Sequence, residues 1–532
     1  MSFVHLHCRS YFSLKDGAYS PEELAVRAAE LGMPAVALTD RDGLYGTVRF
    51  TDACRRAGVK PVLGAWLTLE AGASPAFFRV LLLARDAVGY GNLCRLITEA
   101  HMAGERSEPS LSPREIMVRA EGLICLLGPE SPPGVLASGG RPGAARERAR
   151  PWKEAFGPWC FVEVRDLLEP GSTGEVRRLL RLAEDAGLPA VATNAVRHLG
   201  PEDAFLADAL ECMREIVPVA QHHLSRVNAE GYLKSSREMR TLFAHRPDLC
   251  DNTFRIAEAC AFQLDLGAVH FPPFPVPRGR SATSLLAERC HRGIDVRGMP
   301  RSREILDRLD GELALIHKLG YSGYFLTVAD IVEEVKEMGI RCGARGSAAG
   351  SLVCYLTGVS EVDPIHHGLL FERFVNPLRD ELPDIDIDVE SARREEVYQR
   401  ILRRYGEDRC ACVTMVDTYR ARAAIREVGK ALGYPEPEID VVSKAFPHIG
   451  AHRIRDALGS LPELRDSNLQ AGQLEVLFRV AERLNGFPRH LALHPSGIVL
   501  SDHDLPDRVP MERSFLEHRM VQADKDDVER LG

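Results

Sequence analysis

Residues 381–390 read Glu-Leu-Pro-Asp-Ile-Asp-Ile-Asp-Val-Glu, with acidic residues at every second position from Asp384 to Glu390. Alternate side chains of a β-strand share a face, so the pattern predicts a strand with one acidic and one aliphatic face. Four carboxylates on one strip repel one another unless a cation lies among them. Mg²⁺, which prefers oxygen ligands and joins carboxylates to phosphate oxygens, is the expected occupant. An ordinary solvated strand face is the alternative.

A run of small residues precedes this strand. Gly343 to Ser351 reads Gly-Ala-Arg-Gly-Ser-Ala-Ala-Gly-Ser, and an apolar run through Leu356 follows. Small residues and a Ser entering a helical pattern predict backbone N–H groups that approach a phosphate at a helix N-terminus. Close packing of a Gly/Ala-rich turn is the alternative. Together with the acidic strand, the turn indicates a triphosphate site beside two metal ions, and hence nucleotidyl transfer.

Three segments are similar to the palm of bacterial C-family DNA polymerases, the α subunits of DNA polymerase III. They are Gly346-Ser347, residues 369–377 (Leu-Leu-Phe-Glu-Arg-Phe-Val-Asn-Pro) and residues 383–386. The resemblance implies a nucleotidyltransferase palm of the DNA polymerase β type, in which Asp384 and Asp386 bind the catalytic Mg²⁺ ions. It also implies that Gly346, Ser347 and Arg373 hold the triphosphate. Arg373 suits this role because its planar fork binds phosphate oxygens in a bidentate way.

Other segments bear on the branch within this family. Residues 418–422, 488–491 and 524–527 resemble the error-prone, damage-tolerance branch more than the replicative one, whereas Ala523 stands where that branch commonly has Trp. The expected function is therefore template-directed DNA synthesis, error-prone or replicative, with primer–template DNA and deoxynucleoside triphosphates as substrates.

The N-terminal half alternates short aliphatic runs with helical patterns up to about residue 265. Buried strands are predicted at Phe3–His7, Pro34–Thr39, Pro61–Leu67, Arg79–Ala84, Leu123–Leu127, Cys160–Val164 and Pro189–Thr193. Repeated βα units predict a parallel sheet with helices outside and sites at the carboxyl ends of the strands. This region resembles the PHP domain, a distorted (β/α)₇ barrel whose active members bind a metal cluster and cleave phosphoesters.

The metal ligands of active PHP domains are poorly matched here. Their motifs correspond to His7-Cys8-Arg9, Thr39-Asp40-Arg41 and Ala195-Val196-Arg197, and two further ligands correspond to Trp66 and Arg79. His7, Asp40 and Glu163 remain, but Arg has no lone pair with which to bind a metal. We therefore expect a degenerate site without metal, in which Arg9, Arg41, Arg79 and Arg197 form salt bridges with the surviving acids. A phosphoesterase is correspondingly disfavoured.

These patterns predict an α/β multidomain protein. We expect a PHP-like domain at 1–269, a stiff Pro-rich linker at 270–282, a first palm part at 283–417 and a second at 494–532. The helix-rich insertion at 418–493 is, by resemblance, the thumb. Residues 132–149 read as a flexible low-complexity segment.

Composition is that of a soluble globular protein. The 532 residues are 45% hydrophobic and 27% charged, and the 13 Cys form no CxxC pair, so reduced thiols are expected. Neither a signal peptide nor a long apolar run is evident, which predicts a cytoplasmic protein without a membrane partner. The net charge of -9 argues against a uniformly basic DNA-binding surface, but Arg-rich segments such as 400–404 and 420–426 can bind phosphates locally.

The C-terminal residues match a point in the family that precedes its third catalytic carboxylate. The fingers, the clamp-binding segment and an OB-like domain would follow in relatives. We therefore expect an N-terminal portion of a polymerase that is inactive in primer extension by itself. Its sliding clamp and other replisome or damage-tolerance partners would bind the absent part. The alternative function is a catalytically inactive polymerase fragment that binds DNA or a partner protein.

Overall fold

The computed structural model describes residues 3–70, 77–103, 108–221, 228–268, 270–375, 385–460 and 474–532. The chain forms two compact units. The first comprises Met1–Ala268, Cys412–Gly497 and Leu505–Gly532, and the second comprises Val269–Ala411 and Ile498–Asp504. The domain boundaries expected from the sequence stay predictions.

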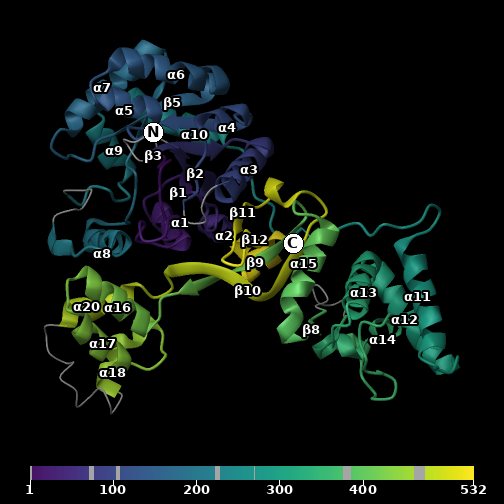
Figure 1. Ribbon diagram of the computed structural model, residues 1–532. Helices are drawn as coiled ribbons and strands as arrows, with labels where there is room; N and C mark the ends of the chain where they lie inside the picture. Colours follow the sequence, from purple (N-terminus) through teal and green to yellow (C-terminus); the bar gives the residue numbers. More distant parts are fainter. Residues whose placement is uncertain are drawn as a thin grey trace. The chain divides into compact units, whose positions relative to one another are not determined.

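A six-stranded curled sheet forms the centre of the N-terminal part of the first unit (Figure 1). Its strands are β1 (Ala35–Arg41), β2 (Lys60–Glu70), β3 (Phe77–Ala84), β4 (Leu123–Leu127), β5 (Cys160–Arg165) and β6 (Ala190–Thr193). Their spatial order follows the chain order, which is the arrangement of a barrel and not of a doubly wound sheet.

Not every strand of this sheet runs in the expected direction. Neighbours are parallel in the pairs β1–β2, β4–β5 and β5–β6, but β3 is antiparallel to both β2 and β4. Only residues 71–76 separate β2 from β3, too few for the crossover that a parallel pair requires. The prediction of a wholly parallel sheet is therefore wrong at β3.

The predicted first strand, Phe3–His7, is extended but irregular. The Ala37 N–H donates to the His5 carbonyl at 2.9 Å, and the Val196 N–H donates to the His7 carbonyl at 2.9 Å. The segment thus lies between β1 and the chain that follows β6, where it joins the two edges of the sheet without forming a regular strand.

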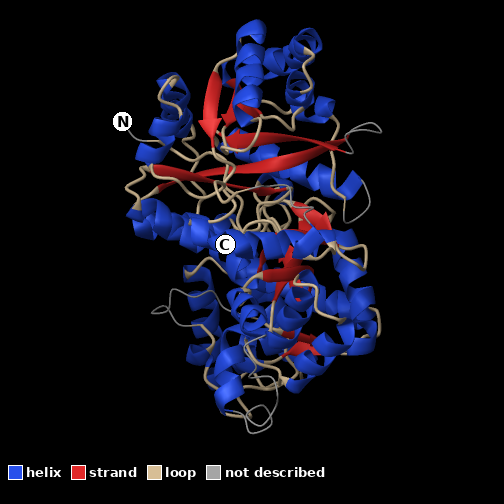
Figure 2. Ribbon diagram, turned by 90° about the vertical axis from the view of Figure 1, so that its left-hand side faces the viewer, coloured by secondary structure: helices blue, strands red, loops and turns tan. Residues whose placement is uncertain are grey.

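Helices flank the strands of this sheet (Figure 2). They are α1 (Pro21–Glu30), α2 (Thr47–Ala57), α3 (Ala87–Ala103), α4 (Pro113–Val118), α5 (Pro132–Ser138), α6 (Pro142–Phe156), α7 (Ser172–Ala186), α9 (Ser236–Leu242) and α10 (Pro247–Ala259). A further helix, α8 (Ala204–Glu215), instead packs against the helical segment 421–431. The segment 132–149, expected to be flexible, instead lies in α5 and α6. Pro132 and Pro142 each stand in the first turn of a helix, where a missing N–H costs nothing, and Ala145, Ala149 and Trp152 give α6 a buried side.

The rest of the first unit contains a helical bundle and a small sheet. The bundle comprises α16 (Ala421–Ala431), α17 (Glu436–Ala445), α18 (Ile454–Ser460) and α20 (Glu475–Arg483), as the helix-rich pattern predicts. The sheet has the order β10-β9-β12-β11, from β9 (Cys410–Thr418), β10 (Pro488–Leu500), β11 (Met511–Arg513) and β12 (Arg519–Asp524), and α21 (Lys525–Leu531) follows.

The second unit is mainly helical. Its helices are α11 (Ala282–Val296), α12 (Arg303–Lys318), α13 (Ser322–Glu337), α14 (Leu352–Leu356) and α15 (Arg394–Tyr405). β7 (Cys342–Ala344) and β8 (Ile387–Val389) form an antiparallel pair. Phe271, in the predicted linker, stacks on Tyr324 of α13 at 5.1 Å between ring centroids, so this Pro-rich segment packs on the helices that follow it. No described helix has both the length and the hydropathy required to span a membrane.

Candidate functional site

The acidic strand has the predicted alternation of faces. Ile385 is buried and Ile387 half-buried, whereas Asp386, Asp388 and Glu390 are exposed. Asp384, the other predicted metal ligand, lies outside the described residues. The carboxylates that the structure describes therefore share one solvent-facing side of β8.

A cation lies among these carboxylates, and it comes from the small-residue run. The Nη2 of Arg345 is 3.1 Å from Oδ2 of Asp386, and its Nε is 3.0 Å from Oδ1 of Asp388. The Arg345 N–H also donates to the Asp386 carbonyl at 3.0 Å. All three side chains are largely exposed, so each ion pair contributes about 1 kcal/mol or less. Sequence reasoning missed this role of Arg345, although the need for a cation was evident from the four acids.

The predicted phosphate-binding residues lie on two short turns that contact each other. Gly346 and Ser347 begin η4 (Gly346–Gly350), and Arg373 ends η5 (Phe371–Arg373). Gly346 has φ +67, a left-handed conformation that favours glycine, and a Cβ added there would have no described atom within 4 Å. Ser347 and Arg373 are both exposed. The structure thus brings the predicted segments together and leaves their polar groups accessible.

The expected phosphate site at a helix N-terminus is wrong for α14, which has 5 residues. The Glu312 carboxylate accepts hydrogen bonds from the N–H groups of Leu352 and Val353, each at 3.1 Å, and from the Ser351 hydroxyl at 3.0 Å. The first N–H groups of α14 therefore already bind the buried carboxylate of Glu312 and are not available to a phosphate. The accessible part of the turn is its beginning, at Gly346 and Ser347.

Arg308 and Glu312, on one side of α12, join the two turns. Arg308 Nε lies 2.7 Å from Glu312, and its Nη2 donates to the carbonyls of Gly350 at 2.9 Å and Leu369 at 3.1 Å. Glu312 is 2% exposed; burial raises its pKa, while the bonds from Arg308 and the backbone oppose that rise. In the sequence these residues form an ordinary i,i+4 pair, which predicts a helix surface, so nothing there identified their role.

We expect Glu312→Ala to lower the free energy of unfolding around α12 and α14 by about 3–5 kcal/mol, because it leaves Arg308 and two buried N–H groups without their anion. Amide hydrogen exchange measured by mass spectrometry reports this locally. Asp310→Ala, which removes an exposed acid of the same helix, is the control and should change stability by about 0.5 kcal/mol or less. Equal protection in the two variants would contradict the role of Glu312.

The surviving PHP acids have partners, but not the expected arginines. His7 Nδ1 lies 2.7 Å from Glu163 Oε1, and the Thr193 hydroxyl donates to the same oxygen at 2.6 Å. Burial alone would raise the pKa of Glu163, but His7 and Arg165 outweigh it and hold this pKa at about 2. Asp40 accepts from Ser10 and Ser13, and its burial still raises its pKa to about 6.

Arg9 and Arg197 pair with acids that sequence reasoning missed. Arg9 Nη1 is 2.7 Å from Asp16, and Arg197 lies 2.8 Å from Asp16 and 2.9 Å from Glu211 of α8. Burial raises the pKa of Asp16, but the two guanidiniums outweigh burial and hold it well below its usual range. The predicted salt bridges therefore exist for these two arginines, with different partners. Only the tertiary fold brings α8 to this place.

The predicted salt bridges are wrong for Arg41 and Arg79. Within the described ranges, no carboxylate lies at ion-pair distance from either residue. Arg79 instead stacks on two rings, with its Cζ 4.5 Å from the centroid of Trp66 and 4.0 Å from that of Phe77. In the same described part of the chain, no group of three or more His, Cys, Asp or Glu side chains is arranged to hold a metal ion.

We expect Asp16→Asn to lower the free energy of unfolding of the first unit by about 3–5 kcal/mol, because two buried guanidiniums lose their shared anion. Urea unfolding followed by circular dichroism measures the change. Asp185→Asn breaks only an exposed pair with Arg181 and should cost about 0.5 kcal/mol or less. A loss for Asp16→Asn as small as that of the control would show that the pair network is not required.

Comparison with known proteins places this fold and site in a class. The PHP domain model matches residues 5–166, and the model of the bacterial DNA polymerase III alpha NTPase domain matches residues 284–532. The fold and these matches define a chain in which a PHP domain precedes a polymerase domain.

Curated relatives match along the whole chain. The chain is 39% identical over 553 residues to the error-prone DNA polymerase of Symbiobacterium thermophilum, with 100% of the chain and 50% of that protein covered. It is 34% identical to DNA polymerase III subunit alpha of Xylella fastidiosa (strain Temecula1) and to that of Bacillus subtilis, each covering 100% of the chain and 48% of the relative. The chain thus carries a PHP domain followed by a bacterial DNA polymerase III alpha NTPase domain, and it is similar to bacterial DNA polymerase III alpha subunits and error-prone DNA polymerases. It spans about half the length of these relatives.

Proposed function

We propose that the protein acts in template-directed DNA synthesis by nucleotidyl transfer at a two-metal site. The observation that carries this proposal is the exposed acidic face of β8, with Asp386 and Asp388 beside the turn that begins at Gly346 and Ser347. In this proposal residues 283–417 and 494–532 form the palm, 418–493 the thumb, 270–282 the linker and 1–269 a PHP-like domain with a degenerate metal site.

The described residues fit a divalent cation that prefers oxygen ligands. Asp386 is exposed, directly precedes β8, and shares Arg345 with the exposed Asp388 of that strand. Asp384 and Asp386 would hold Mg²⁺, which, when bound, lowers the pKa of the attacking 3′ hydroxyl and neutralises the leaving pyrophosphate. In this proposal the pairs of Arg345 with the acids are exchanged for metal, because exposed pairs of this kind are weak.

The phosphate-binding residues act through position and charge. Arg373 offers a planar guanidinium to the phosphate oxygens, and Ser347 offers a hydroxyl from the adjacent turn. Once it leaves the carboxylates, the guanidinium of Arg345 adds a further positive charge next to Gly346. The Arg308–Glu312 pair holds both turns to α12, which limits their movement as the substrate binds.

The identities favour the error-prone, damage-tolerance branch over the replicative one. Error-prone relatives are 35–39% identical to the chain, against 34% for the alpha subunits. The proposed substrates are primer–template DNA and deoxynucleoside triphosphates. A sliding clamp and other replisome or damage-tolerance proteins are proposed as partners of the whole polymerase.

We expect Asp386→Asn to lower primer extension by about 10²–10³, because stabilisation of charge on the transferring phosphates is usually the largest catalytic contribution. The assay uses a fusion of this chain with the C-terminal half of the Symbiobacterium relative, with Mg²⁺ and all four deoxynucleotides. Binding of the primer–template duplex should persist, because phosphate contacts do not depend on the metal site.

Glu390→Gln is the matched control for this experiment. Glu390 lies on the same exposed face but is not a proposed ligand, so its loss should leave extension within about threefold of the unmodified fusion. Extension by Asp386→Asn at the level of this control would remove Asp386 from the mechanism.

A further inference from the structure

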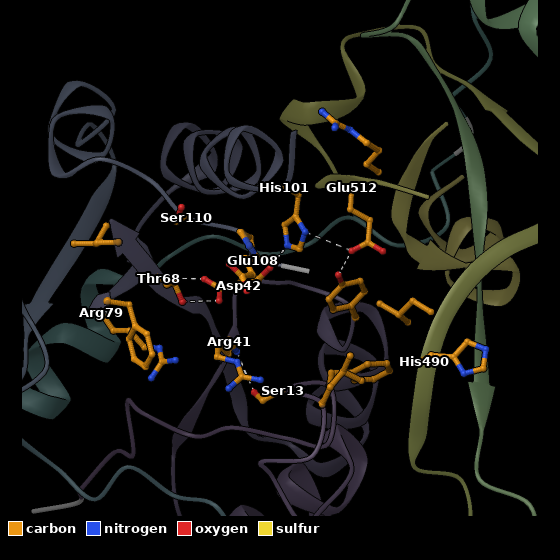
Figure 3. Close-up of a pocket in the computed structure, with 18 of the residues that line it drawn as sticks. Ser13, Arg41, Asp42, Thr68, Arg79, His101, Glu108, Ser110, His490 and Glu512 are labelled. Carbon is orange, nitrogen blue, oxygen red and sulfur yellow. Dashed lines mark hydrogen bonds and ion pairs between the residues drawn. The ribbon is translucent and has the colours of Figure 1, made fainter. Parts of the chain in front are cut away.

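The first unit contains a pocket of about 1350 Å³. Its lining includes Arg41 at the end of β1, Thr68 of β2 and Arg79 of β3 on one side, and Leu491 of β10 and Glu512 of β11 on the other. Figure 3 shows Arg41 and Arg79 on the same side of the pocket, with Glu512 and His490 across from them. The volume is sufficient for a ligand of nucleotide size.

Arg41 and Arg79 are two positive charges without an anion. As described above, neither has a carboxylate at ion-pair distance in the described part of the chain, and Arg79 Nε is buried without a hydrogen-bond partner there. Burial, and then repulsion by Arg41, lower the pKa of Arg79 to about 10, while Asp42 opposes the shift. Removing a guanidinium from water costs free energy, which an anion or several hydrogen-bond acceptors normally offset.

Three of the five acids that line the pocket bind other groups, and the other two, Glu70 and Glu108, are exposed to solvent. The Asp42 carboxylate accepts from the N–H and the hydroxyl of Thr68, each at 2.7 Å. Glu512 accepts from the Tyr45 hydroxyl and lies 3.7 Å from His101, and Glu517 lies 3.4 Å from Arg513. Arg41 and Arg79 are therefore two guanidiniums that have no ion-pair partner among the described residues and that line a space a ligand can enter.

We propose that this pocket binds a small phosphate-bearing ligand of the nucleotide class, with its phosphate between Arg41 and Arg79. Two guanidiniums suit the double charge and the several oxygens of a phosphate monoester. The rings of Phe12, Tyr45 and Phe77 also line the pocket and offer apolar surface to a base. The site is distinct from the proposed triphosphate site, since Ser347 and Arg373 belong to the other compact unit.

Isothermal titration calorimetry of the 532-residue chain, in buffer with a chelator of divalent cations, tests this proposal. The probes are inorganic phosphate, deoxyadenosine 5′-monophosphate and deoxyadenosine. We expect the monophosphate to bind with a Kd of about 1 mM or tighter, and the nucleoside to bind at least about tenfold more weakly. Binding of phosphate as tight as that of the monophosphate would identify free phosphate as the ligand and would support the same anion site.

Arg41→Gln and Arg79→Gln should each weaken binding of the monophosphate by about tenfold or more, which corresponds to about 1.4 kcal/mol. Arg27→Gln, which removes an exposed cation of α1, should leave the Kd unchanged. Circular dichroism verifies that each variant is folded. Because Arg79 is stacked in the structure, Arg41→Gln is the decisive variant if Arg79→Gln does not fold.

Three results would overturn the proposal. One is the absence of binding by the unmodified chain at about 10 mM monophosphate, a concentration at which a Kd of about 1 mM gives near saturation. Another is equal affinity for nucleoside and monophosphate, which would show that the phosphate is not recognised. The third is a Kd for folded Arg41→Gln equal to that of Arg27→Gln.

Discussion

A charged group that leaves water needs an opposite charge or several hydrogen bonds, and this constraint organises both units. Asp16 lies between Arg9 and Arg197, and Arg197 also meets Glu211, so each of these two buried guanidiniums has an anion beside it. Glu312 meets the same requirement through Arg308 and the backbone of α14. These two buried anions fix irregular segments, which have no ladder of backbone hydrogen bonds to hold them.

The charged groups that stabilise the fold are buried, whereas the charged groups proposed to take part in chemistry are accessible to solvent or line a pocket. Asp386 and Asp388 share Arg345 at the solvent-exposed surface. Replacing this arginine by another cation costs little free energy there, because exposed ion pairs are weak. Arg41 and Arg79 are the reverse case, since they line a pocket and have no ion-pair partner among the described residues.

The spacing of apolar and polar residues was sufficient to predict secondary structure wherever a segment followed the period of a strand or of a helix. The alternation from Ile385 to Glu390 gave the faces of β8, and the helix-rich pattern of residues 418–493 gave the bundle of α16, α17, α18 and α20. The same spacing failed where a segment's structure depends on residues far away in the chain, or where helix-breaking and helix-forming residues occur together. Phe3–His7 has strand composition but joins two edges irregularly, and the prolines around 132–142 begin helices instead of a flexible segment. Glu211 lay on a helix that no sequence pattern connected to Arg197.

The sequence by itself indicated the acidic strand and a resemblance to the PHP and polymerase III alpha families, because these rest on residue identity and short spacing. It also showed that Arg replaces several PHP ligands, since a guanidinium cannot bind a metal. Only the tertiary structure decided which acid each arginine meets. Ion pairs depend on distances of a few ångströms between segments far apart in the chain, and Asp16, Glu211 and Glu312 acquire their partners only when the fold brings those segments together.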